Sequence, residues 1–172
     1  MNKRMNALKF ALENEHKERE FYLTNARRTK NLAGKNMFKQ IADEEKEHYE
    51  ILKKLHEKWE EKKKWPETVP LKVKNSLAGS ILISMAGKKS ARFNGNEDDL
   101  KAVRTAIDFE ARGMALYTKL GEESADPREK EFFNLIASVE RQHFLSLCDT
   151  ELFLTDPATW YQNVGKPLLD GA

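Results

Sequence analysis

Apolar residues in the first third of the chain recur at intervals of three, four and seven positions, the spacing of one face of an α-helix. A first helix carries this face at Leu8, Ala11, Leu12, Glu15, Tyr22 and Ala26. Residues 31–34, Asn-Leu-Ala-Gly, interrupt the pattern. A second helix follows, with inward positions at Phe38, Ile41, Ala42, Glu45, His48, Ile51, Leu52 and Leu55. The pattern predicts a helical hairpin over about residues 5–60.

The same spacing returns towards the C-terminus and predicts a second hairpin over about residues 97–153. Its first helix is marked by Ala106, Glu110, Gly113 and Tyr117. Asp126 and Pro127 suit the start of the next helix, with the aspartate as N-cap and the proline at the first helical position. The inner face of that helix carries Phe133, Ile136, Ala137, Glu140, His143 and Leu147.

The two hairpins are related as an internal repeat. An offset of 95 residues aligns Leu8–Leu52 with Val103–Leu147 without a gap. The identical pairs are Ala11/Ala106, Glu15/Glu110, Tyr22/Tyr117, Lys35/Lys130, Phe38/Phe133, Ile41/Ile136, Ala42/Ala137, Glu45/Glu140 and His48/His143. Three of these pairs are the strongest potential metal ligands of each half.

A connector of about residues 59–97 separates the hairpins. Pro66 and Pro70 break helix in it, the sequence Asn-Gly-Asn at 94–96 closes it, and a short helix is expected over 73–86. The tail, 154–172, is expected to pack back on the bundle. Two antiparallel hairpins joined by a long crossover form a known bundle topology. The sequence thus predicts one all-α domain over residues 1–172, a four-helix bundle.

Composition narrows the class of protein further. The net charge is only +2, so nothing calls for a nucleic-acid partner. No segment approaches the roughly 20 apolar residues of a membrane span, and the N-terminus lacks the apolar region of a signal peptide. A cytoplasmic location is therefore expected. The single cysteine, Cys148, excludes a four-cysteine metal site within this sequence.

Glutamate and histidine on the apolar faces need an explanation. Glu45 and His48 are three positions apart and so share a helical face, and Glu140 and His143 repeat this geometry. A solvated glutamate or a hydrogen-bonded core histidine would explain any one of them alone. Four carboxylates converging in one core would repel one another, whereas two divalent cations would balance their formal charge. Mixed oxygen and nitrogen ligands suit iron or manganese.

These motifs resemble the rubrerythrin family of ferritin-like di-iron proteins. The resemblance rests on Glu15-x-x-Glu18-x-x-x-Tyr22, on residues 41–48, on Glu110-x-x-Gly113-x-x-x-Tyr117 and on residues 140–143, and it covers about Leu8–Leu55 and Val103–Leu152. It implies a ferritin-like bundle that holds two iron ions, with manganese as another possibility. The ligands that the resemblance implies are Glu15, Glu45, His48, Glu110, Glu140 and His143.

The sequence departs from the family in two ways. The rubredoxin domain, with its four cysteines, has no counterpart, so a separate protein would have to supply electrons. The extra glutamate that the family carries three residues after its third-helix ligand is Gly113 here, while the repeat-related position in the first helix is Glu18. We therefore hypothesise that Glu18 is a seventh ligand that competes with His143, against the alternative of a solvated glutamate between Lys17 and Arg19. Tyr22 and Tyr117 are expected near the site, as hydrogen-bond donors, one-electron buffers or core residues.

The resemblance implies an oxidoreductase that reduces hydrogen peroxide to water. Two alternatives remain open: a ferroxidase that oxidises ferrous iron with oxygen or peroxide, and a bundle in which the metal is structural. A homodimer is also expected, because bundles of this kind pair or exchange helices and a long connector permits exchange.

Overall fold

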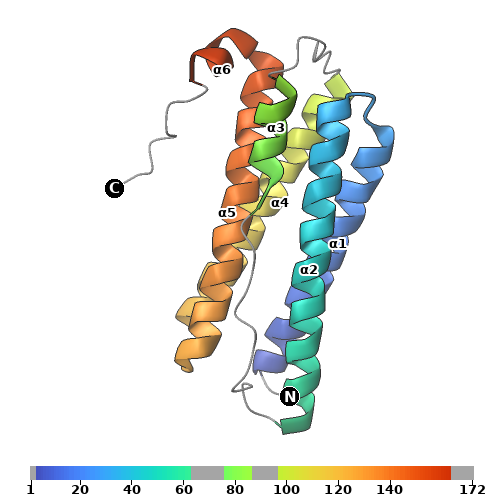
Figure 1. The fold of residues 1–172 in the computed structure, drawn as a ribbon. Coiled ribbons are helices and arrows are strands. Elements are labelled where there is room, and N and C mark those ends of the chain that lie inside the picture. Colours follow the sequence, from blue (N-terminus) through green and yellow to red (C-terminus); the bar gives the residue numbers. More distant parts are fainter. Residues whose placement is uncertain (1–2, 63–75, 87–96, 164–172) are drawn as a thin grey trace.

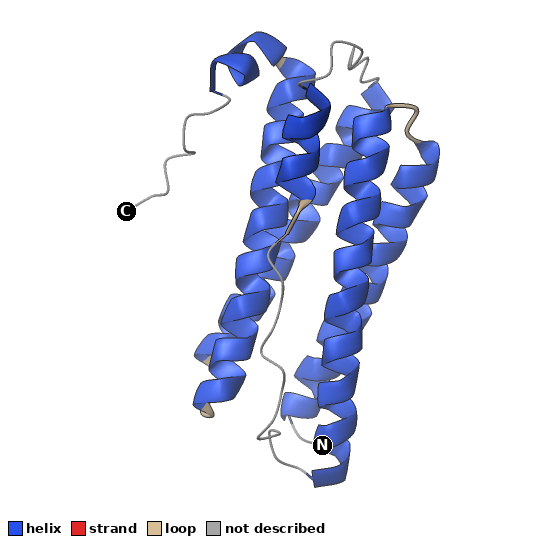
Figure 2. Ribbon diagram, in the orientation of Figure 1, coloured by secondary structure: helices blue, strands red, loops and turns tan. Residues whose placement is uncertain are grey.

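The described part of the chain is helical apart from short connecting segments. The computed structural model describes residues 3–62, 76–86 and 97–163. They form α1 (Lys3–Arg28), α2 (Leu32–Lys62), α3 (Ala78–Ala86), α4 (Glu97–Glu122), α5 (Pro127–Thr155) and α6 (Pro157–Asn163). No strand occurs within these ranges (Figure 2). The all-α class predicted from the sequence is confirmed.

Four long helices make up the bundle. α1 packs along α2, α4 packs along α5, and α1 also meets α4. The short helix α3 lies against α2 and α5, on one side of the bundle (Figure 1). The last helix, α6, packs on α5. The helix α3 therefore covers only one face of the four-helix bundle. As a result, the two repeated halves have different surroundings.

The second helix of each pair starts in the same way. The Asn31 Oδ1 atom accepts a hydrogen bond from the Gly34 N–H at 3.1 Å, just before α2. The Asp126 side chain accepts from the Arg128 N–H at 2.9 Å, just before α5, with Pro127 as the first helical residue. The predicted N-cap at Asp126 is thus present. Positions 31 and 126 are 95 apart, so the offset of the repeat extends to both caps.

Several boundaries differ from those expected. α2 begins at Leu32, inside the predicted interruption, and runs to Lys62, past the predicted start of the connector. α3 begins at Ala78, because Ser76 Oγ accepts from the Ala78 N–H and the chain turns into the helix there. The rest of the expected 73–86 helix, both connector prolines and residues 94–96 lie outside the described residues.

The start of the predicted tail is helical. α5 continues to Thr155, and α6 follows after a break of one residue. Trp160 of α6 is buried and its ring lies 4.8 Å from that of Phe153, edge to face. The expected packing of the tail on the bundle is therefore seen for residues 157–163, and residues 164–172 lie outside the described part.

The core consists of two hydrophobic clusters along the bundle axis. The lower cluster contains Leu8, Ala11, Leu52, Leu55, Trp59, Tyr117, Phe132, Phe133, Ile136 and Ala137. The upper cluster contains Tyr22, Ala26, Met37, Phe38, Ile41, Ala42, Ala78, Ala102, Val103, Ala106 and Leu147. The 95-residue offset exchanges them: Leu8, in the lower cluster, corresponds to Val103 in the upper one, and Tyr22, in the upper, to Tyr117 in the lower. The sequence repeat therefore relates the residues of one cluster to those of the other.

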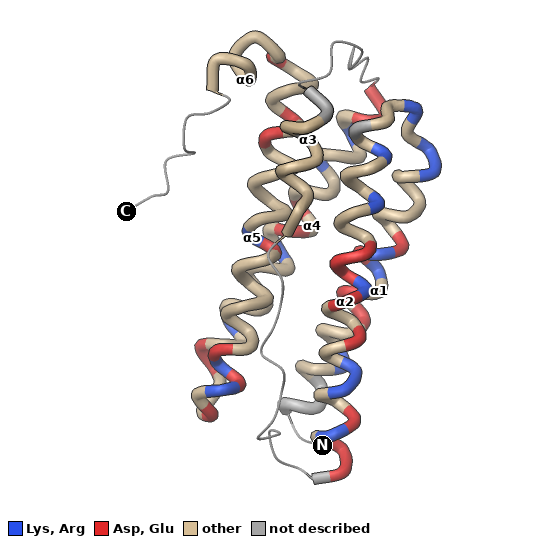
Figure 3. Tube along the Cα trace, in the orientation of Figure 1, with Lys and Arg blue, Asp and Glu red and all other residues tan. Residues whose placement is uncertain are grey.

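Charged residues are spread along the four long helices, while α3 and α6 carry none (Figure 3). Within the described ranges, no helix is both long enough and apolar enough to cross a membrane.

Candidate metal centre

Between the two hydrophobic clusters, each long helix turns a carboxylate or a histidine inward. On α1, for example, Glu15 lies between Ala11 of the lower cluster and Tyr22 of the upper one. The structure brings together all six residues expected as ligands, each no more than 2% exposed: Glu15, Glu45, His48, Glu110, Glu140 and His143. The helical spacing that faces apolar residues inward thus carries these polar side chains into the same core.

The six residues form two overlapping sets of ligand atoms. One set is Glu15, Glu45, His48 and Glu140, and the other is Glu45, Glu110, Glu140 and His143. Within each set, one atom from every residue lies within 4.8 Å of the others. Glu45 and Glu140 belong to both sets, so their carboxylates would serve two metal ions if each set held one. Glu15 with His48, and Glu110 with His143, would be the terminal ligands.

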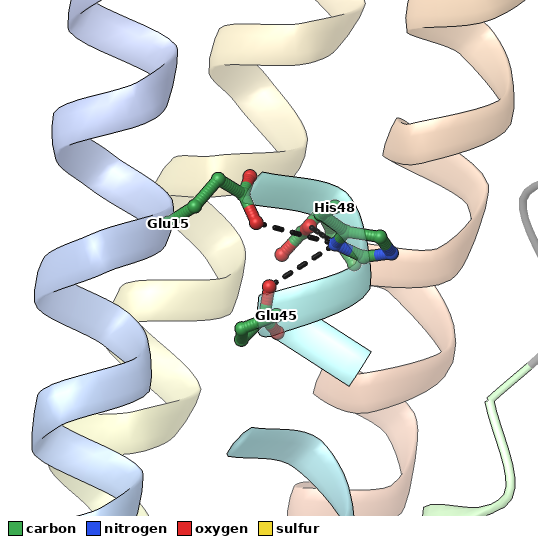
Figure 4. Close-up of side chains that lie close together, drawn as sticks. Glu15, Glu45 and His48 are labelled. Atoms are coloured by element: carbon green, nitrogen blue, oxygen red, sulfur yellow. Dashed lines mark hydrogen bonds and ion pairs between the residues drawn. The ribbon is translucent and has the colours of Figure 1, made fainter. Parts of the chain in front are cut away.

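Both histidines turn Nδ1 towards the carboxylates. The Nδ1 atom of His48 is 3.1 Å from Glu45 Oε2, 3.3 Å from Glu15 Oε2 and 3.4 Å from Glu140 Oε1. Figure 4 shows Glu15 reaching from α1 and Glu45 from α2 towards this nitrogen. The Nδ1 atom of His143 is 3.0 Å from Glu45 Oε1 and 3.4 Å from Glu110 Oε2. The rings stack with centroids 6.2 Å apart.

Protons balance the charge of the cluster when no cation does so. Burial, together with the charge of Glu45, raises the pKa of Glu15 to about 8. Burial and the same carboxylate also raise the pKa of Glu140. Burial would lower the pKa of His48, but the Glu45 carboxylate outweighs it and raises that pKa. Burial would raise the pKa of Glu45, whereas the charges of His48 and His143 lower it.

The donor set fits divalent metal ions. Several buried ligand atoms have no hydrogen-bond partner among the described residues: Glu15 Oε2, Glu45 Oε1, Glu110 Oε2, both Glu140 oxygens and His143 Nδ1. A buried polar atom without a partner typically costs 1–3 kcal/mol, and more if charged. A cation would satisfy these atoms together. Carboxylate oxygens with imidazole nitrogens suit iron or manganese better than calcium, which prefers oxygen alone.

Two tyrosines reach across between α1 and α4 to hold the carboxylates of Glu110 and Glu15. The Tyr22 hydroxyl donates to Glu110 Oε1, and the Tyr117 hydroxyl donates to Glu15 Oε1. Both tyrosines are fully buried, and burial followed by the neighbouring carboxylate raises each phenol's pKa. The hydrogen bonds expected from the sequence are therefore present. Each one links α1 to α4 and leaves the other oxygen of its carboxylate free for a metal.

Glu18 belongs to the cluster and is not the solvated side chain of the alternative hypothesis. It is only 3% exposed, although Lys17 beside it is exposed. Burial raises its pKa, and the next causes are the charges of Glu140 and Glu110, both members of the His143 set.

Gly113 provides the room that Glu18 needs. A Cβ atom at Gly113 would lie 3.1 Å from Glu140 Oε2 and 3.5 Å from Glu18 Oε1. The Glu18 carboxylate therefore reaches the space beside the position that is an acidic residue in the resembled family. The asymmetry between positions 18 and 113 follows from this packing, because side chains at both would compete for the same space.

Sequence reasoning missed Glu44. Its Oε2 atom lies 2.6 Å from His143 Nε2, and its side chain is 14% exposed. Residues 43–47 form a charged run, which is typical of a solvated helix face, so nothing in the helical periodicity singled it out. Only the placement of α5 against α2 brings the two groups together.

The fold and the site define a ferritin-like helical bundle with a buried glutamate–histidine cluster that can hold metal. The family model of rubrerythrin matches residues 6–81, which contain most of α1, all of α2 and the start of α3. This match confirms the predicted resemblance and supports the ferritin-like di-iron family. The second half of the site, on α4 and α5, lies outside the matched range and is assigned here from its geometry. No curated protein and no solved structure matches the chain.

Proposed function

We propose that this protein is a di-iron oxidoreductase that reduces hydrogen peroxide to water with electrons from a separate donor protein. The observation that carries the proposal is the pair of four-residue sets that share Glu45 and Glu140. Two iron positions joined by carboxylates suit a two-electron reaction. When two ferrous ions are bound, they supply the two electrons that cleavage of the O–O bond requires. The rubrerythrin match favours iron over manganese.

The protein's own residues would hold the reacting centre and shield it. Glu45 and Glu140, which belong to both sets, and His48 and His143, which belong to one set each, would hold the two ions. Tyr22 and Tyr117 keep the terminal carboxylates in one orientation through their hydroxyl groups. The two hydrophobic clusters lie on either side of the centre along the bundle axis and would exclude water from those directions.

In this proposal Glu18 is the seventh ligand, on the His143 side. Oxidation of two ferrous ions adds two positive charges, one of which a further carboxylate can offset. Replacing Glu18 by alanine is expected to leave ferrous binding within about threefold of wild type, because the six other ligands remain. It should slow peroxide turnover by roughly 10-fold or more, in line with the 10–100-fold typical of groups that support a metal site. Rapid-mixing absorption spectra would show an altered oxidised form.

The matched control for Glu18 is Glu13→Ala, an exposed glutamate on the same helix. A Glu18→Ala protein with wild-type oxidised spectrum and wild-type turnover would rule out the seventh ligand.

Anaerobic rapid mixing of the ferrous protein with peroxide, and separately with oxygen, tests the function. Peroxidase activity predicts fast oxidation by peroxide, slow oxidation by oxygen, and iron that stays bound through repeated reduction with a chemical donor. Iron that is oxidised and then leaves the site would favour the ferroxidase alternative. Bound metal that shows no redox change with either oxidant would favour a structural role and contradict the proposal.

A further inference from the structure

Glu44 forms a contact that has no equivalent in the other half of the site. The Nδ1 atom of His143 points towards the buried carboxylates of the site, so its Nε2 atom points the other way, towards α2. There the Glu44 Oε2 atom lies 2.6 Å away. A histidine that binds metal through Nδ1 carries its proton on Nε2, and this proton would be donated to Glu44. The contact therefore selects the tautomer that leaves the Nδ1 lone pair free.

The Glu44 carboxylate is itself held from two directions. Its other oxygen, Oε1, accepts from Gln40 Nε2 at 2.7 Å and from the Leu77 backbone N–H at 2.9 Å. Next to this bond, the Ser76 N–H donates to Gln142 Oε1 at 2.8 Å. Gln40 lies one turn before Glu44 on α2, and Leu77 immediately precedes α3. The orientation of the carboxylate is thus fixed both by its own helix and by the segment that leads into α3.

The repeat shows that this support is present on one side only. Adding 95 to position 44 gives Val139, and adding 95 to position 40 gives Leu135. Neither side chain can accept a hydrogen bond. This difference between the two halves coincides with the position of α3. That helix covers one face of the bundle and has no repeat-related partner among the described helices.

We propose that Glu44 is a positioning residue that orients His143 and makes the metal position with Glu110 and His143 the tighter of the two. Carboxylates that accept from the outer N–H of a ligand histidine fix the ring and raise its basicity. Their loss typically costs 10–100-fold in metal affinity. The inference rests on the proposed two-metal site. It predicts which of the two positions binds metal more tightly, whereas the six ligands alone leave the two positions nearly equivalent.

The test is a titration of the metal-free protein with cobalt(II), followed by calorimetry and by the visible absorption of bound cobalt. Wild type should bind in two unequal steps. Glu44→Gln should weaken the tighter step by about 10–100-fold and leave the other within about threefold. Glu50→Gln, an exposed glutamate on the same helix, is the control and should change neither step.

Proton NMR of the cobalt-loaded protein separates positioning from a general structural effect. The exchangeable imidazole N–H signal of His143 should be slow to exchange in wild type and should broaden or vanish in Glu44→Gln, while that of His48 is unchanged. Equal weakening of both steps, or no change in either, would overturn the inference and leave the proposed function intact. A wild-type protein that binds no pair of cobalt ions would contradict the proposed function together with this inference.

Discussion

Replacing Glu140 by glutamine is expected to weaken both metal positions by at least about 100-fold, since even groups behind the ligands are worth 10–100-fold. The reason is that Glu140 belongs to both sets of ligand atoms. Glu15→Gln removes a ligand from one set only, so this variant should keep one tightly bound ion at the position of Glu110 and His143. Equilibrium dialysis against ferrous iron or manganese, with metal analysis of the protein, measures both results.

The melting temperature of the metal-free Glu140→Gln variant shows whether any loss of metal binding is due to unfolding. Burial and the Glu45 charge raise the Glu140 pKa, so this carboxyl destabilises the metal-free fold when it ionises. The amide removes that cost, and the metal-free variant should melt at or above the wild-type temperature at neutral pH. Glu131→Gln, an exposed change on the same helix, should bind metal as wild type does. A Glu140→Gln protein that still binds one ion tightly would show that the carboxylate does not bridge.

Metal-free protein is expected to lose stability as pH rises from about 5 to about 8. The pKa of Glu15 is raised from its ordinary value of 4.5 to about 8, so the folded state holds a proton that the unfolded chain releases in this window. Stability falls with pH wherever the folded state binds more protons. The raised histidine pKa values act in the same direction, because their contribution is present below the unfolded value and lost as pH rises. Glu45, with its lowered pKa, contributes above 4.5 and loses its effect only in acid.

The size of this pH effect is on the order of several kcal/mol, at 1.36 kcal/mol per unit of pKa. That corresponds to a fall in Tm of roughly 10 °C for a chain of this length. Calorimetric melting at a series of pH values would measure it. Saturating manganese should flatten the curve, because the cation replaces the protons, and Glu15→Gln should flatten part of it without metal. A metal-free Tm that rises or stays level between pH 5 and 8 would contradict the electrostatic description of the cluster.

The helical faces and the six inward side chains could be predicted because periodicity and the repeat act along the chain. Glu15 and Glu110, for instance, recur at the same place in the same pattern. The contacts of Glu18 and Glu44 could not be predicted this way. Glu18 is buried because Gly113, on another helix, leaves it space, and Glu44 contacts the cluster only because α5 brings His143 to it. Both sit among charged neighbours, so local sequence resembles that of a solvated face.

The proposed difference in affinity between the two metal positions likewise has no signal in the sequence. The repeat makes the halves look alike, and the difference comes from the segment that leads into α3, where the Leu77 N–H donates to Glu44. A short apolar helix in a connector carries no sequence signal of such a contact. The contacts that make the two halves of the site different therefore arise from packing between helices that are far apart in the sequence.

The central claim is that two metal positions share Glu45 and Glu140 in one bundle. The most direct measurement is an anaerobic ferrous titration of metal-free protein by equilibrium dialysis, with iron and protein determined on the same sample. Saturation at two ferrous ions per chain is the predicted result. Saturation at one ion per chain, or no tight binding, would contradict the claim.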